Sequence, residues 1–346
     1  MSKTLQDYAT LINDTIQSNE INHYITTDNM CQNLGGIDTL KNINIPQGKV
    51  RSFQKDDVLL SNIRLYFRKV YRAKQKGGCS SDVLVFRAKH IDSATLFAIL
   101  SSQIFTDYAC SGSQGSKMPR GNKTHMMDFK IPTINFTIAK IFNSIQNKIE
   151  NNHKINKLLH TLAYKIYEYY FKYKPKNAKL EQIIIENPKS NIMVKNAQKT
   201  QDKYPFFTSG DNILSYPKAI IDGRNCFLNT GGNAGIKFYV GKASYSTDTW
   251  CICANEFSDY LYLLLSSIKT HINQSFFQGT SLKHLQKNLL KKYPIYMPSA
   301  HEIKKFNQIM MPLLTLISIN TRTSKKLEQI RDFLLPLLLK QQVKPK

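Results

Sequence analysis

Two long segments of the chain each carry one narrow apolar seam. Apolar residues recur there at alternating spacings of three and four, the pattern of helices that pair as coiled coils. Polar residues interrupt both seams near the middle, where a buried Asn can set the register of a helix pair. The first seam consists of Ile138, Phe142, Ile145, Ile149, Asn152, Asn156, Leu159, Ala163, Ile166 and Tyr170. The second consists of Ile303, Phe306, Met310, Leu313, Ile317, Asn320, Ser324, Leu327, Arg331, Leu334 and Leu338.

The length of these segments favours one of two interpretations. An ordinary amphipathic helix packed on its own domain would show the same periodicity, but about 36 residues span ~54 Å, more than a small domain needs. We therefore expect the two helices to pair with each other, antiparallel because a whole module must fold between them. Pro312 is expected to kink or delay the second helix, so that its first turns form a separate piece.

Short motifs recur along the chain at nearly one offset, which indicates an internal duplication. The period is too long for a solenoid and predicts two copies of one domain-sized module. The matching pairs are SSDVLVF (80–86) with STDTWCI (246–252), AILSS (98–102) with LLLSS (263–267), SQGSK (113–117) with FQGTS (277–281), and KIP (130–132) with YMP (296–298).

Outside the long helices, each copy shows the pattern of a mixed α and β module. Short runs rich in Val, Leu and aromatic residues, bounded by Gly and polar clusters, predict strands. Helices are expected at 93–108 and 257–276. The predicted strands are 57–63, 69–73 and 81–88 in the first copy and 218–223, 236–241 and 248–254 in the second.

The predicted fold class is therefore α+β, with two mixed α/β modules alternating with two long helices that pair as an antiparallel coiled coil. A charged segment with two prolines separates the first helix from the second module and is interpreted as a linker. The predicted boundaries are 1–133 for the first module, 134–173 for the first long helix, 174–191 for the crossover linker, 192–298 for the second module, 299–340 for the second long helix and 341–346 for a tail.

The charge of the chain indicates a polyanionic partner. The 346 residues include 48 Lys and Arg against 24 Asp and Glu, a formal charge of +24. In a folded protein this imbalance points first to nucleic acid and then to an anionic membrane. The most apolar run, FLLPLLL (333–339), is far shorter than the ~20 residues that a membrane span needs. No secretory signal opens the sequence, so we expect a cytoplasmic protein.

Sequence motifs of catalysis or metal binding are absent. There is no phosphate-binding loop, nucleophile elbow or HExxH pair, and TGGNAG (230–235) precedes a strand, unlike a dinucleotide fingerprint. The six cysteines show no paired metal spacing and are expected to be free thiols. Asp82 and Asp248 occupy equivalent positions in the two copies, where capping of turns before core strands is the favoured role.

Basic residues gather in three stretches, which favours nucleic-acid binding. Eight Lys and Arg lie from Arg51 to Lys76 with Tyr66, Phe67 and Tyr71 among them, and such cations release counterions when they meet phosphates. In 222–238, Arg and Asn lie among four glycines; both side chains can read base edges. The stretch YACSGSQGSKMPRGNK (108–123) could be a linker, a phosphate-binding loop or a DNA-facing loop, and the last is favoured because it lies inside a module.

Several stretches resemble specificity (S) subunits of type I restriction–modification systems. YITTDNMCQNLGGID (24–38), DVLLSNIRLYFRKVYRA (57–73), GGCSSDVLVFR (77–87) and GSKMPRGNK (115–123) look like a common class of first target-recognition domain. The segment LEQIRDFLLPLLLKQQV (327–343) is similar to the LxxxRDxLLPxLL segment that closes many S subunits. The resemblance covers nearly the whole chain. Outside the motifs quoted, the second module matches the first only weakly, and the first module starts close to residue 1.

This resemblance implies a non-catalytic DNA reader. Each target-recognition domain would bind one half of a split target on double-stranded DNA, and the helix pair would set the gap. Two modification (M) subunits would dock on the helices and methylate adenine, and restriction (R) subunits would join them. S-adenosylmethionine, ATP and Mg are expected on those partners, with no cofactor, metal or membrane contact for this chain. The remaining alternatives are a specificity subunit of another restriction or phage-defence methyltransferase system and a basic coiled-coil nucleic-acid adaptor.

The candidate DNA-contacting residues are basic or amide side chains in the stretches named above. They are Arg64, Arg68, Gln114, Lys117, Arg120 and Lys123 in the first module, and Arg224, Asn233, Lys237, Gln278, Ser281 and Lys283 in the second.

Overall fold

The computed structural model describes residues 3–39, 41–131, 133–197, 203–210, 213–279 and 282–339. The chain forms two compact units, which are described separately. Unit 1 combines residues 1–151 with 324–346, and unit 2 comprises 152–323. The expected tail, 341–346, lies outside the described residues. No helix in the described part of the chain has the length and apolar character that crossing a membrane requires.

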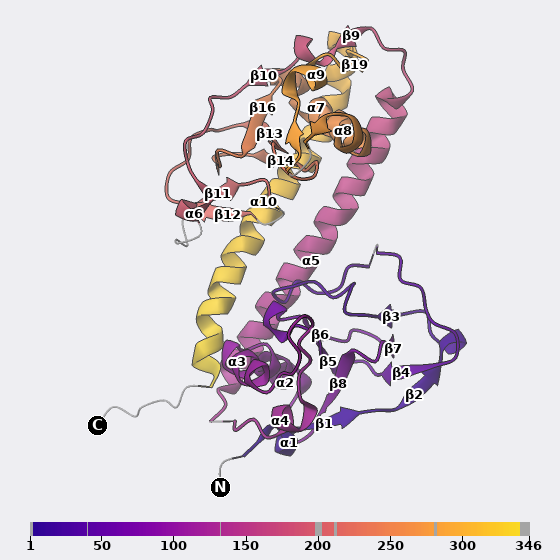
Figure 1. Ribbon diagram of the computed structural model, residues 1–346, viewed down its shortest axis with the longest axis vertical. Coiled ribbons are helices and arrows are strands. Elements are labelled where there is room, and N and C mark those ends of the chain that lie inside the picture. The colour runs from indigo at the N-terminus through magenta and orange to yellow at the C-terminus, as the bar shows by residue number, and fades with distance from the viewer. Residues whose placement is uncertain are drawn as a thin grey trace. The chain divides into compact units, whose positions relative to one another are not determined.

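Unit 1 is built on an antiparallel sheet with the strand order β1-β8-β5-β6 (Figure 1). Helix α2 (Ser93–Leu100) packs on β5, β6 and β8, and α3 (Gln103–Ser111) follows it. The sheet strands are β1 (Ala9–Ile12), β5 (Val58–Ser61), β6 (Val70–Arg72) and β8 (Val83–Ala88). A second sheet has the order β2-β4-β7-β3, with β2 (Thr15–Gln17), β3 (Tyr24–Ile25), β4 (Lys49–Phe53) and β7 (Gly77–Cys79). Short helices α1 (Leu5–Tyr8) and α4 (Lys123–Met127) complete the unit.

Unit 2 contains a sheet with the strand order β10-β16-β13-β14, covered by α7 (Ser258–Ser267) and followed by α8 (Lys269–Ser275). The strands are β10 (Ile185–Glu186), β13 (Arg224–Asn229), β14 (Ile236–Val240) and β16 (Thr249–Cys253). A second sheet joins β11 (Tyr204–Phe207), β12 (Leu214–Tyr216) and β15 (Ser244–Tyr245). The remaining elements are α6 (Val194–Ala197), α9 (Lys287–Lys291), and the strand pairs β9 (Ala178–Lys179) with β19 (Pro294–Ile295) and β17 (Phe277–Gln278) with β18 (His284–Leu285).

The two units repeat one topology, which confirms the duplication inferred from the short motifs. Strands β1, β8, β5 and β6 of unit 1 correspond in order and antiparallel pairing to β10, β16, β13 and β14 of unit 2. In unit 1, β8 leads into the helices α2 and α3, and in unit 2, β16 leads into α7 and α8. A short helix then follows in each, α4 or α9. The duplication therefore extends through this sheet and the helices that follow it, whereas the second sheets of the two units differ.

Five of the six predicted strands are confirmed, and one is wrong. The run 218–223 was expected to be a strand because of Ile220 and Ile221, yet outside the named strands it makes only the single bridge of Ile221 to Ala243. The strand at this place in the sheet is β13, which pairs with β14 on one side and β16 on the other and has mostly buried residues. Each predicted long helix in the modules is two helices. In unit 1, α2 ends at Leu100 with Ser101 as its C-cap, and Ser102 caps α3 by accepting a hydrogen bond from the Phe105 N–H.

The long helices α5 (Phe136–Tyr167) and α10 (Ala300–Leu338) contribute to the cores of both units. Every residue of the two predicted seams is buried or half-buried. Helix α5 continues as a π-helix over Glu168–Lys172. The break expected near Pro312 is wrong, since α10 runs through it without interruption. The loss of one backbone hydrogen bond does not end a helix whose apolar face is buried on both sides of that point.

Contacts between α5 and α10 occur within each unit. In unit 1 the Arg331 guanidinium donates to Gln146 Oε1 at 3.1 Å, and both side chains are buried. In unit 2 Asn320 Nδ2 donates to Asn156 Oδ1 at 3.0 Å, and Asn156 Nδ2 donates to Thr321 Oγ1 at 3.2 Å. Two polar seam positions, Asn156 and Asn320, thus pair with each other.

The segment 174–191, expected to be a crossover linker, is folded into unit 2. Its strands β9 and β10 pair with β19 and β16, and Leu180 between them is fully buried. This segment therefore supplies the edge strand of the unit 2 sheet. The prolines and charges of this segment suggested a linker. Edge strands tolerate both, so the same composition also fits the strand that the structure shows.

Candidate nucleic-acid interface

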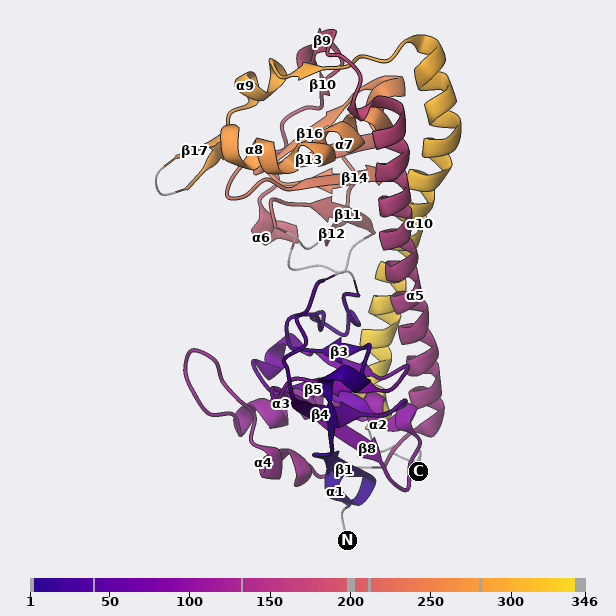
Figure 2. The same cartoon turned by 90° about the vertical axis from the view of Figure 1, so that its right-hand side faces the viewer.

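A tight main-chain hairpin lies between α3 and α4 of unit 1 (Figure 2). Gln114 and Arg120 exchange both of their backbone hydrogen bonds, at 2.9 and 2.8 Å, and close a loop of residues 115–119. Gly115 opens this loop with φ +97°, in the region that favours glycine. The stretch that the sequence left open between linker, phosphate loop and DNA-facing loop is thus an ordered hairpin.

The connection between β5 and β6 holds this hairpin through its backbone. The Arg64 N–H donates to the Pro119 carbonyl at 2.9 Å, and the Gly121 N–H donates to the Asn62 carbonyl at 3.2 Å. The Arg64 side chain also donates to the Lys117 carbonyl at 3.3 Å. We call this set of bonds the unit 1 clamp. It brings four predicted residues together, Arg64, Gln114, Lys117 and Arg120.

Unit 2 contains the same arrangement. Gln278 pairs with His284 in the β17–β18 hairpin, and Gly279 after Gln278 has φ +139°. The connection between β13 and β14 holds this hairpin, because the Gly232 N–H donates to the Lys283 carbonyl at 2.9 Å and the Leu285 N–H donates to the Thr230 carbonyl at 3.0 Å. These bonds form the unit 2 clamp, which matches the two backbone bonds of the unit 1 clamp.

The two aspartates at equivalent positions, Asp82 and Asp248, hold the connections that form the clamps. The Asp82 carbonyl accepts from the Asn62 N–H at 2.7 Å, and the Asp248 carbonyl accepts from the Thr230 N–H at 3.2 Å. The carboxylate of Asp82 forms an ion pair with Arg120 at 3.0 Å. The structure therefore supports the structural role expected for both aspartates.

Most predicted residues at the hairpins are exposed to solvent. The side chain of Arg120 is 61% exposed even though it is ion-paired. Lys123 begins α4 beside the unit 1 hairpin, and Asn233 lies in the connection that carries the unit 2 clamp. Ser281 lies outside the described residues. The exposed members are Gln114, Lys117, Arg120, Lys123, Asn233, Gln278 and Lys283.

Three predicted residues have their charged groups engaged inside their own unit. Arg68 donates to the Ser101 carbonyl at 2.8 Å, and burial lowers the pKa of its guanidinium. Lys237 Nζ donates to the Thr208 carbonyl at 2.7 Å. Half-buried cations with such partners hold loops together more than they reach for phosphate. The structure favours a packing role for Arg68 and Lys237.

Arg224 is the clearest case of an internal role. It lies in β13 rather than in the glycine-rich loop, and its Nε and Nη2 each lie 2.6 Å from a carboxylate oxygen of Asp259. Its Nη1 donates to Thr315 Oγ1 of α10 at 3.0 Å. Asp259 is 2% exposed. A bidentate pair of this kind fixes α7 and α10 against the sheet.

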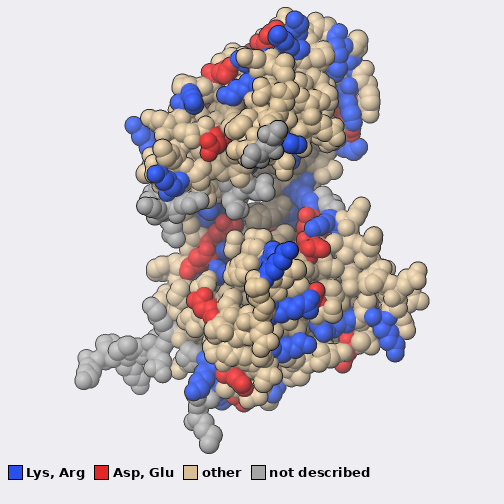
Figure 3. Space-filling view, viewed as in Figure 1, with Lys and Arg blue, Asp and Glu red and all other residues tan. Residues whose placement is uncertain are grey.

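The surface charge is consistent with a nucleic-acid partner but does not single out one patch. On the face drawn in Figure 3, Lys and Arg side chains are distributed over each unit with fewer carboxylates between them. Groups of three or more His, Cys, Asp or Glu that could hold a metal ion are absent from the described part of the chain. All six cysteines are free thiols.

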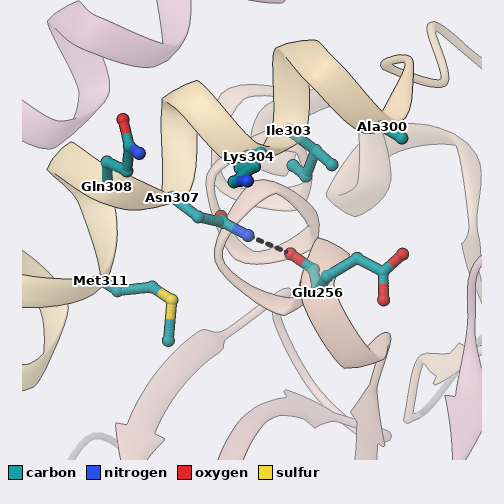
Figure 4. A pocket seen from close by; sticks show the side chains of 7 residues that line it. All are labelled: Glu256, Ala300, Ile303, Lys304, Asn307, Gln308 and Met311. Atoms are coloured by element: carbon teal, nitrogen blue, oxygen red, sulfur yellow. Dashed lines mark hydrogen bonds between the residues drawn. The ribbon is translucent and has the colours of Figure 1, made fainter.

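A hollow of about 420 Å³ lies on α10 beside residues 255–257 of unit 2 (Figure 4). Asn307 Nδ2 crosses its floor to donate to the Glu256 carbonyl at 2.8 Å. Its other lining residues are Ala300, Ile303, Lys304, Gln308 and Met311. With one carboxylate and one ammonium group on opposite elements, the hollow offers no acid–base pair in contact with a nucleophile.

Comparison with known proteins agrees with the duplicated fold. Residues 176–329 match the family model of the type I restriction modification DNA specificity domain. The matched residues make up a little under half of the chain, and this segment resembles the DNA specificity domain of type I restriction–modification systems. The matched segment contains the β10–β16–β13–β14 sheet and the unit 2 clamp.

One solved structure resembles the chain in fold over nearly its whole length. The S subunit of a type I restriction–modification system from M. genitalium is 13% identical, with a TM-score of 0.66, and the match covers 99% of this chain and 96% of that one. The HsdS subunit from Thermoanaerobacter tengcongensis is 13% identical over 98% and 96% of the two chains, with a TM-score of 0.37. Only the first of these two supports the fold. No curated protein sequence gives a significant match.

The sequence missed one feature of the interface, the β5–β6 and β13–β14 connections as partners of the hairpins. These contacts join residues more than 50 positions apart, such as Arg64 and Pro119. The available signal was the SQGSK and FQGTS pair, which already placed the two hairpins in one register.

Proposed function

We propose that this chain is a specificity subunit that reads a bipartite, gapped DNA target, one half with each unit. The observation that supports this most directly is the duplication. The DNA specificity domain matches unit 2, and unit 1 repeats its sheet order and its clamp. With two copies of one DNA-reading module, the chain can bind two half-targets, one with each copy. The exposed basic and amide side chains at the hairpins, among them Gln114 and Lys283, are the proposed DNA-contacting groups.

The helices α5 and α10 are proposed to pair as an antiparallel coiled coil that sets the gap. Gln146 meets Arg331 in unit 1 and Asn156 meets Asn320 in unit 2, so residue numbers rise along one helix as they fall along the other. The 39 residues of α10 correspond to ~58 Å of helix. This length exceeds one turn of DNA, which is about 34–36 Å.

We further propose that the outer faces of these helices bind the M subunits. Ile155, Leu158 and Leu162 lie three and four residues apart on α5, outside the seam, and are 43%, 58% and 48% exposed. On α10, Ile330 and Phe333 are 48% and 72% exposed. Apolar side chains that recur on one helix face without internal partners favour a protein partner.

In this proposal the chain itself is non-catalytic. Adenine methylation, with S-adenosylmethionine, belongs to the M subunits, and ATP and Mg belong to the R subunits. The two units of the chain bind the DNA target. The chain thereby selects the sites at which the M and R subunits carry out their reactions.

The test is to express the chain with its M subunit in a host that lacks adenine methylation and to map the methylated sites. A two-part motif with a fixed gap is expected. Arg120→Ala should weaken recognition of one half only, and Lys283→Ala the other half only. Arg331→Lys is the control, since its guanidinium lies in the unit 1 core. A continuous motif, or no methylation with a folded complex, would contradict the proposal.

A further inference from the structure

The tips of both hairpins expose one large apolar side chain. Met118 is 52% exposed and Leu282 is 58% exposed. Each lies three positions after the glycine that opens its loop and directly before the residue whose carbonyl is held by the clamp, Pro119 or Lys283. The two residues therefore occupy the same position of the duplicated fold.

Folding does not account for this agreement. Neither side chain belongs to a hydrophobic core cluster of the described residues. The neighbouring positions have diverged, with Pro119 matched by Lys283 and Arg120 by His284. A single exposed apolar residue needs no explanation, but two at one position of diverged copies indicate a shared external contact.

The surroundings of the tips favour duplex DNA as that contact. Lys117 and Arg120 flank Met118, and Lys283 and His284 follow Leu282. Cations at these places can hold phosphates on either side of a groove. The major groove admits a two-stranded ribbon, and the apolar group that a base presents there is the C5-methyl of thymine.

The clamps would keep the tips in position before DNA arrives. The Arg64 and Gly232 N–H groups hold the carbonyl directly after each apolar residue, at 2.9 Å in both units. A loop fixed by backbone bonds loses less conformational freedom on binding than a loose one. Burial of an apolar side chain at the tip of such a loop favours binding, and little conformational entropy of the loop is lost.

We propose that Met118 and Leu282 are base-contacting residues, each of which packs on a thymine methyl group in the half-target of its own unit. The proposal rests on the proposed DNA-reading function and assigns it two specificity-determining residues. The contact is apolar, so it contributes to sequence preference and not to the salt dependence of binding, which reports phosphate contacts.

The experiment uses the complex of the full chain with its M subunits and a library of duplexes with a randomised core. Duplexes are selected by binding and sequenced, and the selected duplex is then remade with uracil in place of each thymine in turn. Uracil lacks only the methyl group. We expect one uracil position in each half-target to weaken binding about threefold to fivefold, the factor that burial of one methyl group carries.

The protein variants assign each position to its residue. Met118→Ala should weaken binding by a similar factor and abolish the uracil effect in one half-target, while the other half keeps it. Leu282→Ala should do the reverse. Both should leave the slope of log K against log salt unchanged, whereas Lys117→Ala should lower it by about one. The control is Met193→Ala, since Met193 is 53% exposed but lies outside the hairpins.

The outcomes separate this proposal from the function on which it rests. If the wild-type complex selects a motif but both alanine variants bind and respond to uracil as the wild type does, Met118 and Leu282 are not base contacts and the DNA-reading function stands. If the wild-type complex selects no motif, the proposed function is wrong and this proposal falls with it. Because both side chains are exposed, the variants should melt at the wild-type temperature.

Discussion

Replacement of Arg224 by Met tests whether this residue stabilises unit 2 or contacts DNA. The change removes the two 2.6 Å bonds to Asp259 and the bond to Thr315, and it leaves a carboxylate that is 2% exposed without its counter-charge. Breaking a buried pair by removing one partner costs about 3–5 kcal/mol. We expect the free energy of unfolding of unit 2 to fall by that amount.

The sole tryptophan makes the measurement specific to unit 2. Trp250 lies in β16, is 3% exposed and donates to Glu186 Oε2 at 2.8 Å, so its fluorescence reports the unfolding of this sheet. For an m-value near 2 kcal/mol/M, the expected loss lowers the urea midpoint by roughly 1.5–2.5 M. Adding Asp259→Leu to Arg224→Met should recover most of the loss, since an apolar pair needs no counter-charge.

Arg120→Met is the matched control for this prediction. It removes an ion pair of the same chemistry, but the side chains of Arg120 and Asp82 are 61% and 27% exposed, so the stability cost should stay within about 1 kcal/mol. Duplex affinity should instead fall. The reasoning is refuted if Arg224→Met keeps the wild-type urea midpoint while its complex loses DNA affinity, because Arg224 would then be a DNA contact after all.

Three further predictions follow from local geometry. Gly279→Ala makes the new Cβ collide with the Leu282 carbonyl oxygen at φ +139° and should reduce duplex binding with little change in the urea midpoint; unchanged binding would contradict the role proposed for the unit 2 hairpin in DNA binding. Burial raises the pKa of Cys79 to about 12, so iodoacetamide at pH 8 should alkylate this thiol only after unfolding. Mass spectrometry of the labelled peptide checks this. Burial lowers the pKa of His160, so unfolded chains bind the extra proton first. Stability should therefore fall as pH drops below about 6.5, and His160→Gln should flatten this trend in urea titrations followed by Trp250 fluorescence.

Local periodicity made the helices and most strands predictable. Every position of both seams lies in α5, its π-helical continuation or α10 and is at least half-buried, because the three-and-four spacing needs no knowledge of the partner. Within the long helices, the break expected at Pro312 was wrong, since the effect of a proline depends on how much packing surrounds it. His160 of α5 lies against Tyr262 of α7, a contact that the sequence could not predict because it does not show which helix face α7 covers.

Partners distant in sequence made the site only partly predictable. The hairpins were found because they recur as SQGSK and FQGTS. Arg224 was predicted to contact DNA. Its partner Asp259 is 35 residues away, and no local sequence pattern indicates an ion pair between a strand and a helix. Extending the hairpin register by one residue would have aligned Met118 with Leu282.

The clamps explain how two copies can keep one loop and still read different sequences. The bond from Arg64 to Pro119 and the bond from Gly232 to Lys283 both use backbone groups alone. Main-chain hydrogen bonds do not depend on side-chain identity, so substitution at these positions leaves the loop in place. The side chains that the hairpins present are then free to diverge, as Arg120 and His284 have. A reader of two unlike half-targets needs this separation, because the backbone supplies the geometry and each copy supplies its own chemistry.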